Sequence, residues 1–146
     1  MDEKFMIRAI ELAKEAAEID EVPVGAVIVK DGRIIAEANN MKERDGCAVS
    51  HAEIVAVKRA AAVAGWRLIG CDIYVTLEPC AMCAGALINS RIDNIYFGAY
   101  DPKAGCCGTL YNLPADKRFN HRPKVRGGIL EKECAALLSG YFKTKR

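Results

Sequence analysis

The sequence predicts an α/β protein in which a mixed β-sheet lies between layers of helices. The first observation is the order of expected elements, β-β-α-β-α-β with a helix at each end. The second is the stretch VPVGAVIV at residues 22–29, which is nearly all apolar, as in a strand buried on both faces in the middle of a covered sheet. The third is the length of 146 residues, which fits one domain, residues 1–146, with a core that needs no disulfides.

The first half of the chain should contain a helix, a hairpin and a second helix. The first helix has apolar residues at helical spacing, namely Phe5, Ala9, Leu12, Ala13 and Ala16. After the strand at 22–29, Asp31 and Gly32 form a two-residue hairpin signal, so the strand from Arg33 should return antiparallel. Residues 39–50 are polar and aperiodic, which predicts a loop. Helical spacing resumes from Glu53, and Gly65 is typical of a helix end.

The second half alternates strands and helices. Strands are expected at 72–77, 94–99 and 124–126, and helices at 80–89 and 131–142. Residues 100–123 are rich in turn-forming residues and should contain at most a short helix. The two strand–helix–strand units should be right-handed crossovers that join parallel strands.

The composition is that of a globular protein, with 51% hydrophobic and 27% charged residues. The acidic N-terminus, MDEKFMIRAI, lacks the features of a signal peptide. Uncharged runs reach only 12 residues, whereas a membrane-spanning helix needs about 20. Seven cysteines cannot all pair. We therefore expect a cytoplasmic protein with reduced thiols and no membrane segment, in which closely spaced cysteines bind metal or take part in catalysis.

Positive charge is concentrated near the end of the chain. Residues 117–146 contain nine Lys or Arg and two Asp or Glu, a net charge of +7, whereas residues 1–116 carry −5. This asymmetry suggests a polyanionic partner that docks at one end. A solvated surface with an uneven charge distribution would give the same count, so charge alone leaves both interpretations open.

Cys80 and Cys83 lie three positions apart where a helix is expected to begin. This spacing puts both side chains on one helix face, and the start of a helix stabilises thiolates. Pro79 is compatible with a helix start. The pair suits half of a zinc site and a redox disulfide equally well.

His51 and Glu53 favour the zinc site. His51 with Cys80 and Cys83 makes three ligands, and three protein ligands plus water is the pattern of a catalytic zinc site, whereas structural sites close with four. Zinc lowers the pKa of its bound water to about 7, and Glu53 could move that proton to a substrate. A fourth ligand would have to come from residues that repeat no metal-binding spacing: Cys47, Cys71, Cys106, Cys107, Cys134 or His121. Taken singly, Glu53 could be an ordinary first-turn acid, and His51 a helix cap or core residue.

These residues match the H-x-E and P-C-x-x-C signature of the zinc-dependent cytidine deaminase superfamily. Beyond the signature, the chain resembles bacterial tRNA-specific adenosine deaminases over nearly its whole length. The matching stretches are EVPVGAVIV, HAEIVAV, WRLIG, YVTLEPCAMCAGAL, SRI, FGAYDPKAG, FNHR and GGIL, and EKECAALLSGYF is similar to the last helix of that family.

The resemblance implies a three-layer α-β-α fold with a mixed five-stranded sheet, a homodimer, and deamination of adenosine to inosine at the wobble position of a tRNA anticodon. It implies one Zn²⁺ per chain held by His51, Cys80 and Cys83, with Glu53 as the proton shuttle. It also implies contacts to the anticodon stem-loop. The residues matched to these contacts are Asn40, Asp101, Lys103, Asn120, His121 and Arg122.

Two positions depart from the pattern of the family. Tyr100 stands where an Arg is frequent, and its ring could stack on a base instead. Cys106 and Cys107 replace small residues and are expected to be loop residues rather than ligands, because adjacent side chains rarely converge on one metal.

Two other functions remain compatible with the motif. The same chemistry could act on free cytosine, guanine or a nucleoside, although the basic segment and the FNHR match argue against it. A zinc or thiol-redox module without catalysis would make Glu53 dispensable.

Overall fold

The protein is described by a computed structural model that covers residues 1–145. In this part of the chain the sheet has five strands in the order β2-β1-β3-β4-β5. They are β1 (Gly25–Lys30), β2 (Arg33–Asn39), β3 (Cys71–Leu77), β4 (Asn94–Ala99) and β5 (Lys124–Arg126). Strand β1 is antiparallel to β2 and to β3, whereas β3, β4 and β5 are parallel. The predicted mixed five-stranded sheet is confirmed.

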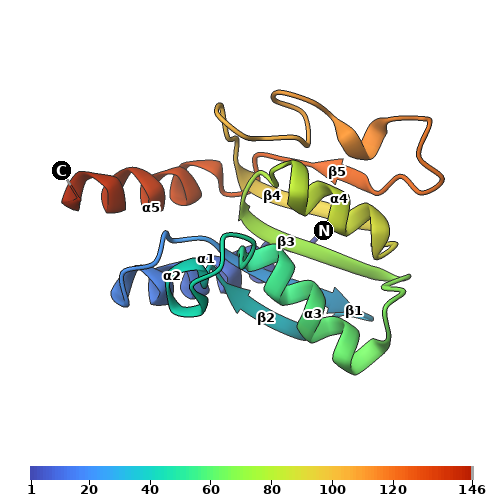
Figure 1. Ribbon diagram of the computed structural model, residues 1–146, viewed down its shortest axis with the longest axis horizontal. Helices are drawn as coiled ribbons and strands as arrows, with labels where there is room; N and C mark the ends of the chain where they lie inside the picture. The colour runs from blue at the N-terminus through green and yellow to red at the C-terminus, as the bar shows by residue number, and fades with distance from the viewer. Residues whose placement is uncertain (146) are drawn as a thin grey trace.

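Helices cover both faces of the sheet, which gives the expected three layers (Figure 1). On one face, α1 (Glu3–Glu18) packs on Val27 and Val29 of β1, and α5 (Glu131–Thr144) packs on β4. On the other face, α3 (Ala52–Ala64) and α4 (Ala81–Asn89) pack with Ala26 and Ile28. The alternation along β1 follows from the strand geometry, in which successive side chains point to opposite faces. Because helices cover both faces of the sheet, side chains on both sides of β1 are buried, and the strand is apolar at consecutive positions.

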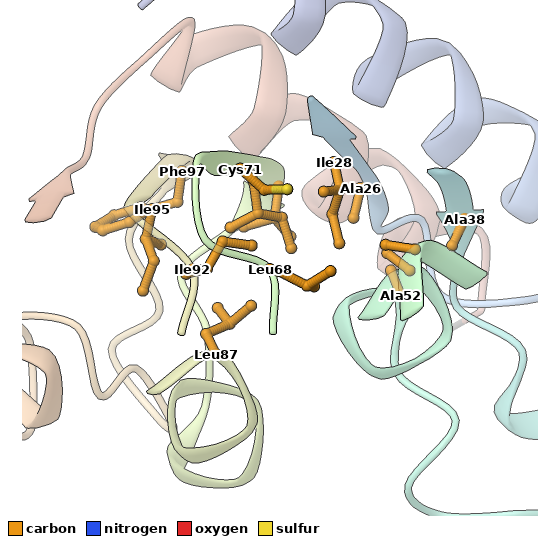
Figure 2. Close-up of a cluster of buried hydrophobic side chains, with 14 of the residues drawn as sticks. Ala26, Ile28, Ala38, Ala52, Leu68, Cys71, Leu87, Ile92, Ile95 and Phe97 are labelled. Carbon is orange, nitrogen blue, oxygen red and sulfur yellow. The ribbon is translucent and has the colours of Figure 1, made fainter. Parts of the chain in front are cut away.

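The core under α3 and α4 joins the two helices to the sheet (Figure 2). Ala52, Ala56 and Ala60 are fully buried at four-residue intervals, so α3 lies close to the sheet along one face. Leu87 of α4 and Ile28 of β1 are fully buried in the same cluster. Each buried side chain of this size stabilises the fold by about 1.5–3 kcal/mol. This packing fixes the two helices whose first residues form the site described below.

Most of the predicted elements are found. Asp31 and Gly32 both have positive φ, 50° and 73°, as a type I′ hairpin turn requires. Helix α3 ends before Gly65, and β4 has the predicted bounds. The turn-rich segment contains one short 3₁₀ helix, η1 (Leu113–Ala115). Because β1 is antiparallel to both β2 and β3, those two strands are parallel, as expected for the first crossover.

Two predictions near the start of the sheet are wrong in detail. The strand predicted at 22–29 begins at Gly25, because Pro23 has no N–H and the N–H of Val24 donates to the carbonyl of Val22 in a tight turn rather than to a neighbouring strand. The loop predicted at 39–50 contains a short helix, α2 (Lys42–Asp45), whose side chains are all exposed. The buried carboxylate of Glu21 accepts hydrogen bonds from the N–H groups of Glu43 and Arg44 and thereby holds this turn.

All seven cysteines are free thiols. No helix within residues 1–145 is both long enough and apolar enough to span a bilayer.

Candidate active site

A pocket of about 190 Å³ opens where β3 ends and where α3 and α4 begin. Its floor contains His51, Glu53 and Cys80. One wall comes from the segment after β2, with Asn40 and Lys42, and the opposite wall from the segment after β4, which includes Asp101. Strand ends next to a crossover are a common place for sites in α/β sheets. The pocket therefore lies where the sequence pattern placed it.

Three side chains converge at the floor of this pocket. His51 is the N-cap residue of α3, Cys80 is the N-cap residue of α4, and Cys83 lies in the first turn of α4. The Nδ1 atom of His51 is 3.7 Å from Sγ of Cys80 and 3.5 Å from Sγ of Cys83. All three atoms lie within 4.8 Å of one another. The two helix starts thus bring together residues about 30 positions apart in the sequence.

This geometry fits a tetrahedral zinc site. With Zn–N of about 2.05 Å and Zn–S of about 2.3 Å, tetrahedral angles place N and S about 3.6 Å apart. The two observed distances, 3.7 and 3.5 Å, bracket that value. The remaining His, Cys, Asp and Glu side chains of residues 1–145 do not join this set. Three ligands of this kind would leave one corner of a tetrahedral site for water or substrate.

The local electrostatics favour a thiolate at Cys80. A hydrogen bond from Cys83, together with the hydrogen bond to His51, lowers the pKa of the Cys80 thiol to about 3, against the opposing effect of partial burial. The backbone dipole at the start of α4 acts in the same direction. Deprotonated sulfur is the form that binds zinc, and Cys80 favours this form, whereas the hydrogen bond with Cys80 and burial raise the pKa of the Cys83 thiol.

Glu53 lies beside these ligands without belonging to them. It is in the first turn of α3, and its side chain is 4% exposed. Burial raises the pKa of Glu53 to about 7. A carboxyl group that titrates near neutral pH can both accept and release a proton, which is what a general acid–base group must do. His51 and Glu53 both line the pocket.

Two of the residues expected to contact the substrate line the pocket. Asn40 is buried, donates from Nδ2 to the carbonyl of Val22 at 3.4 Å, and accepts at Oδ1 from the N–H of Lys42. Asp101 accepts at Oδ1 from the N–H groups of Lys103 and Ala104. Both side chains therefore shape their own loops as well as facing the pocket. Their contact with a nucleotide stays a prediction.

The other expected contacts do not line the pocket. Lys103 is exposed and is not a lining residue. The Nε2 atom of His121 is 2.6 Å from the carbonyl oxygen of Ile92, which precedes β4, so the segment with Asn120 and Arg122 lies at the amino end of that strand. The pocket is beside its carboxyl end, since Asp101, which follows β4, lines it. Within one chain the structure does not bring this segment to the zinc ligands.

The two departures from the family pattern have clear places in the structure. Tyr100 is 49% exposed and packs edge-on against Phe97, with ring centroids 5.0 Å apart. Its stacking on a base stays a prediction. Cys106 and Cys107 are buried, and their N–H groups donate to the carbonyl of Pro79 and the carboxylate of Glu78. In the described chain they lie outside the metal-binding set, as expected.

Two buried carboxylates near the pocket were not predicted from the sequence to have a role. Glu21 is 1% and Glu78 is 2% exposed. Each accepts hydrogen bonds from backbone N–H groups of a segment that forms one pocket wall. A sequence signal did exist, since each acid stands beside an apolar strand, where an unpaired charge would be costly.

Known proteins were compared with this chain. Residues 1–99 match the family described as the cytidine and deoxycytidylate deaminase zinc-binding region. The chain belongs to this deaminase family. It is 50% identical to the tRNA-specific adenosine deaminase of Bacillus subtilis (strain 168) over 146 residues, which covers 99% of this chain and 91% of that protein. The enzyme of the same name from Haemophilus influenzae is 44% identical over 99% of this chain and 85% of its own length.

Solved structures of the deaminase family superpose closely on this one. A structure from studies of A-to-I editing by tRNA:A34 deaminases at the wobble position of transfer RNA is 42% identical with a TM-score of 0.90, and covers 94% of this chain and all of that one. A guanine deaminase from Nitrosomonas europaea is 26% identical with a TM-score of 0.80, over 97% of this chain and 84% of that one. The shared fold therefore includes deaminases of free bases as well as of tRNA.

Proposed function

We propose that this protein deaminates adenosine to inosine at the wobble position of a tRNA anticodon. The observation that carries the proposal is the cluster of His51, Cys80 and Cys83 with Glu53 beside it, in a chain 50% identical to a tRNA-specific adenosine deaminase over nearly its full length. A substrate of this kind would place the enzyme in the cytoplasm.

One zinc ion per chain would be held by Nδ1 of His51 and by the sulfur atoms of Cys80 and Cys83. When bound, zinc makes water acidic enough to act as a nucleophile near neutral pH. The carboxylate of Glu53 would take the proton from this water as its oxygen adds to C6 of adenine. Glu53 would pass this proton to a ring nitrogen, then take the second proton from the hydroxyl group now on C6 and give it to the amino group, so that the C6–N bond breaks, ammonia leaves and the C6 carbonyl of inosine remains.

The burial of Glu53 supports this role. A carboxyl group with a pKa of about 7 loses and regains its proton at little cost at physiological pH. It lies outside the candidate ligand set, so proton transfer would not compete with metal binding. An adenine in an anticodon loop is already outside a duplex, so turning it into the pocket costs less than extruding a paired base.

The basic segment is spread along the molecule rather than gathered at one end. Its exposed residues lie on the loop before β5, on β5 and on α5, and include Lys117, Arg118, Lys124 and Arg126. The loop and α5 lie at opposite ends in Figure 1. Arg146, the last residue of the segment, lies outside the described residues. We infer that tRNA phosphates run along this side of the protein.

We also infer that the protein is a homodimer. Helix α4 is not fully covered by the rest of the chain. The side that faces outward carries no charged residue. The residues on this side are Ala81, Met82, Gly85, Ala86 and Asn89. An uncharged face of small side chains is suited to close packing against a second copy.

Deamination of a free base is the second candidate, and the likeness to a guanine deaminase favours it. To separate the two, the protein is incubated with tRNA transcripts, an anticodon stem-loop, free adenosine, cytosine and guanine, and the products are identified by mass spectrometry. Inosine in RNA, formed with a KM that rises with salt, is the expected result. Conversion of a free base alone, insensitive to salt, would refute the proposal.

The variant Glu53→Ala is the matched control for that experiment. It should retain zinc and fold, because the carboxylate is not a zinc ligand. It should lose nearly all deamination, because the proton shuttle is removed. Near wild-type activity of this variant would contradict the mechanism. A reversible Cys80–Cys83 disulfide without zinc would instead favour a redox module.

A further inference from the structure

We infer that Glu78 is a positioning residue, which fixes the pocket wall formed by Asp101 and Ala104 and thereby sets how tightly the substrate nucleotide is held. This inference rests on the proposed function, because it concerns the same pocket. Glu78 directly follows β3 and stands two residues before the zinc-ligand candidate Cys80.

The carboxylate of Glu78 accepts four hydrogen bonds from a single loop. Its Oε1 atom accepts from the N–H of Asp101 at 3.0 Å and from Oγ1 of Thr109 at 2.5 Å. Its Oε2 atom accepts from the N–H groups of Cys107 and Thr109 at 3.1 and 3.0 Å. Three backbone groups across nine residues are thus tied to one side chain. These donors take the place of water around a side chain that is only 2% exposed.

The loop wraps closely around this side chain. The N–H of Cys106 donates to the carbonyl of Pro79, and the N–H of Glu78 donates to the carbonyl of Ala99. A Cβ atom at Gly105 would lie 2.4 Å from the carboxyl carbon of Glu78, so only glycine allows this approach. The loop therefore contacts both the side chain of Glu78 and the backbone beside it.

Glu78 acts through the loop rather than on the substrate. Although it borders the pocket, both of its oxygens are occupied by the loop donors. The wall residue Asp101 receives its position from the bond between its own N–H and Oε1 of Glu78. The opposite wall is built in the same way, since Glu21 accepts from the N–H groups that follow Lys42. The pocket thus has a buried carboxylate behind each wall.

The substitution Glu78→Gln tests the inference with little change in shape. If the amide oxygen takes the place of Oε2, it keeps the bonds from Cys107 and Thr109, and the NH₂ group can donate to the hydroxyl of Thr109. The N–H of Asp101 then loses its acceptor and faces an NH₂ group. The amide therefore releases the Asp101 end of the loop while leaving the other end in place.

Zinc content, thermal unfolding, kcat and KM are measured for the unaltered protein and for Glu78→Gln with an anticodon stem-loop. We expect unchanged zinc and a KM raised about 10-fold, the effect of one lost charge-assisted hydrogen bond, with a much smaller change in kcat. An unchanged KM would overturn the inference. A loss of zinc with equal loss of kcat and kcat/KM would also overturn it, because Glu78 would then support the metal ligands instead.

Two further variants complete the test. Thr109→Val removes only the hydroxyl donor, so it should raise KM by a smaller factor than Glu78→Gln does. If Glu78→Gln does not fold, an unchanged KM in Thr109→Val overturns the inference. Ser90→Ala removes a buried hydroxyl that donates to the carbonyl of Leu87 at the far end of α4, and should leave KM unchanged. Activity of the unaltered protein on tRNA tests the proposed function separately. If only a free base is converted, the same ratio of KM values is measured on that base.

Discussion

The substitution Glu21→Ala should lower the free energy of unfolding, by an amount that can be worked out from the hydrogen bonds of the Glu21 carboxylate. Glu21 accepts from the N–H groups of Glu43 and Arg44 at 3.0 and 2.9 Å, and from the guanidinium of Arg44 at 3.1 Å. In Glu21→Ala the guanidinium, whose side chain is 36% exposed, can turn to water. The main cost is the two backbone N–H groups left without acceptors, together about 2 kcal/mol.

A second Arg–Glu pair supplies the control. Arg8 and Glu37 form a two-pronged contact at 2.7 and 3.1 Å, but their side chains are 33% and 37% exposed. Exposed pairs contribute about 0–1 kcal/mol, so Glu37→Ala should have a small effect. Thermal unfolding measures both variants. We expect Glu21→Ala to lower Tm by about 4–8 °C and Glu37→Ala by much less.

The effect of Glu21 should also depend on pH. Burial works against ionisation of this carboxyl, but the N–H groups of Arg44 and Glu43 and the Arg44 side chain outweigh it, so its pKa lies below the usual 4.5. An acid whose pKa is lowered by folding contributes stability that is complete above its unfolded pKa and is lost as pH falls through its folded pKa. The difference between the unaltered protein and Glu21→Ala should be constant at neutral pH and shrink below pH 4.5. Equal destabilisation by Glu21→Ala and Glu37→Ala, or a difference that grows in acid, would refute the reasoning.

Three other outcomes are expected. His51→Ala should lose both zinc and deamination; zinc near one per chain in this variant, measured by metal analysis, would exclude His51 as a ligand. Glu53→Gln should keep zinc and lower kcat by about 10²–10⁴-fold, because it removes the general acid–base group but keeps its shape; a drop below tenfold in a single-turnover assay would count against the assignment. Ala86→Glu should shift the protein to monomers in analytical ultracentrifugation, since it places a charge on the uncharged side of α4; an unchanged sedimentation coefficient would remove α4 from the interface.

The sequence predicted the elements whose apolar residues repeat and missed those made by distant polar contacts. Helix α1 and strand β4 follow their hydrophobic patterns. Helix α2 has four exposed charged residues and no apolar repeat, and the acceptor for its N–H groups lies about 20 residues earlier at Glu21. The hydrophobic pattern within a segment contains no information about such a distant partner, so the sequence predicts a loop there.

The same distinction applies to the candidate site. His51, Cys80 and Cys83 could be grouped in advance, because zinc binding requires particular residue types and often a short spacing such as that of Cys80 and Cys83. The importance of Glu78 depends on donors at Asp101, Cys107 and Thr109, more than 20 residues later, and no spacing rule connects them. His121 was grouped with the substrate contacts by resemblance, but its bond to the carbonyl of Ile92 places it beside the opposite end of β4.

Helix α5 is joined to the rest of the protein by little apolar contact. Cys134 is its one buried residue among those described, and it packs where Gly98 leaves space on β4. Segments with few buried contacts open with a free energy well below that of global unfolding. Amide hydrogens of α5 should therefore exchange with solvent through local opening, much faster than those of β1 and β3. A helix that can detach while the sheet stays folded would let the cationic end of the chain adjust to the shape of a bound polyanion without disturbing the pocket.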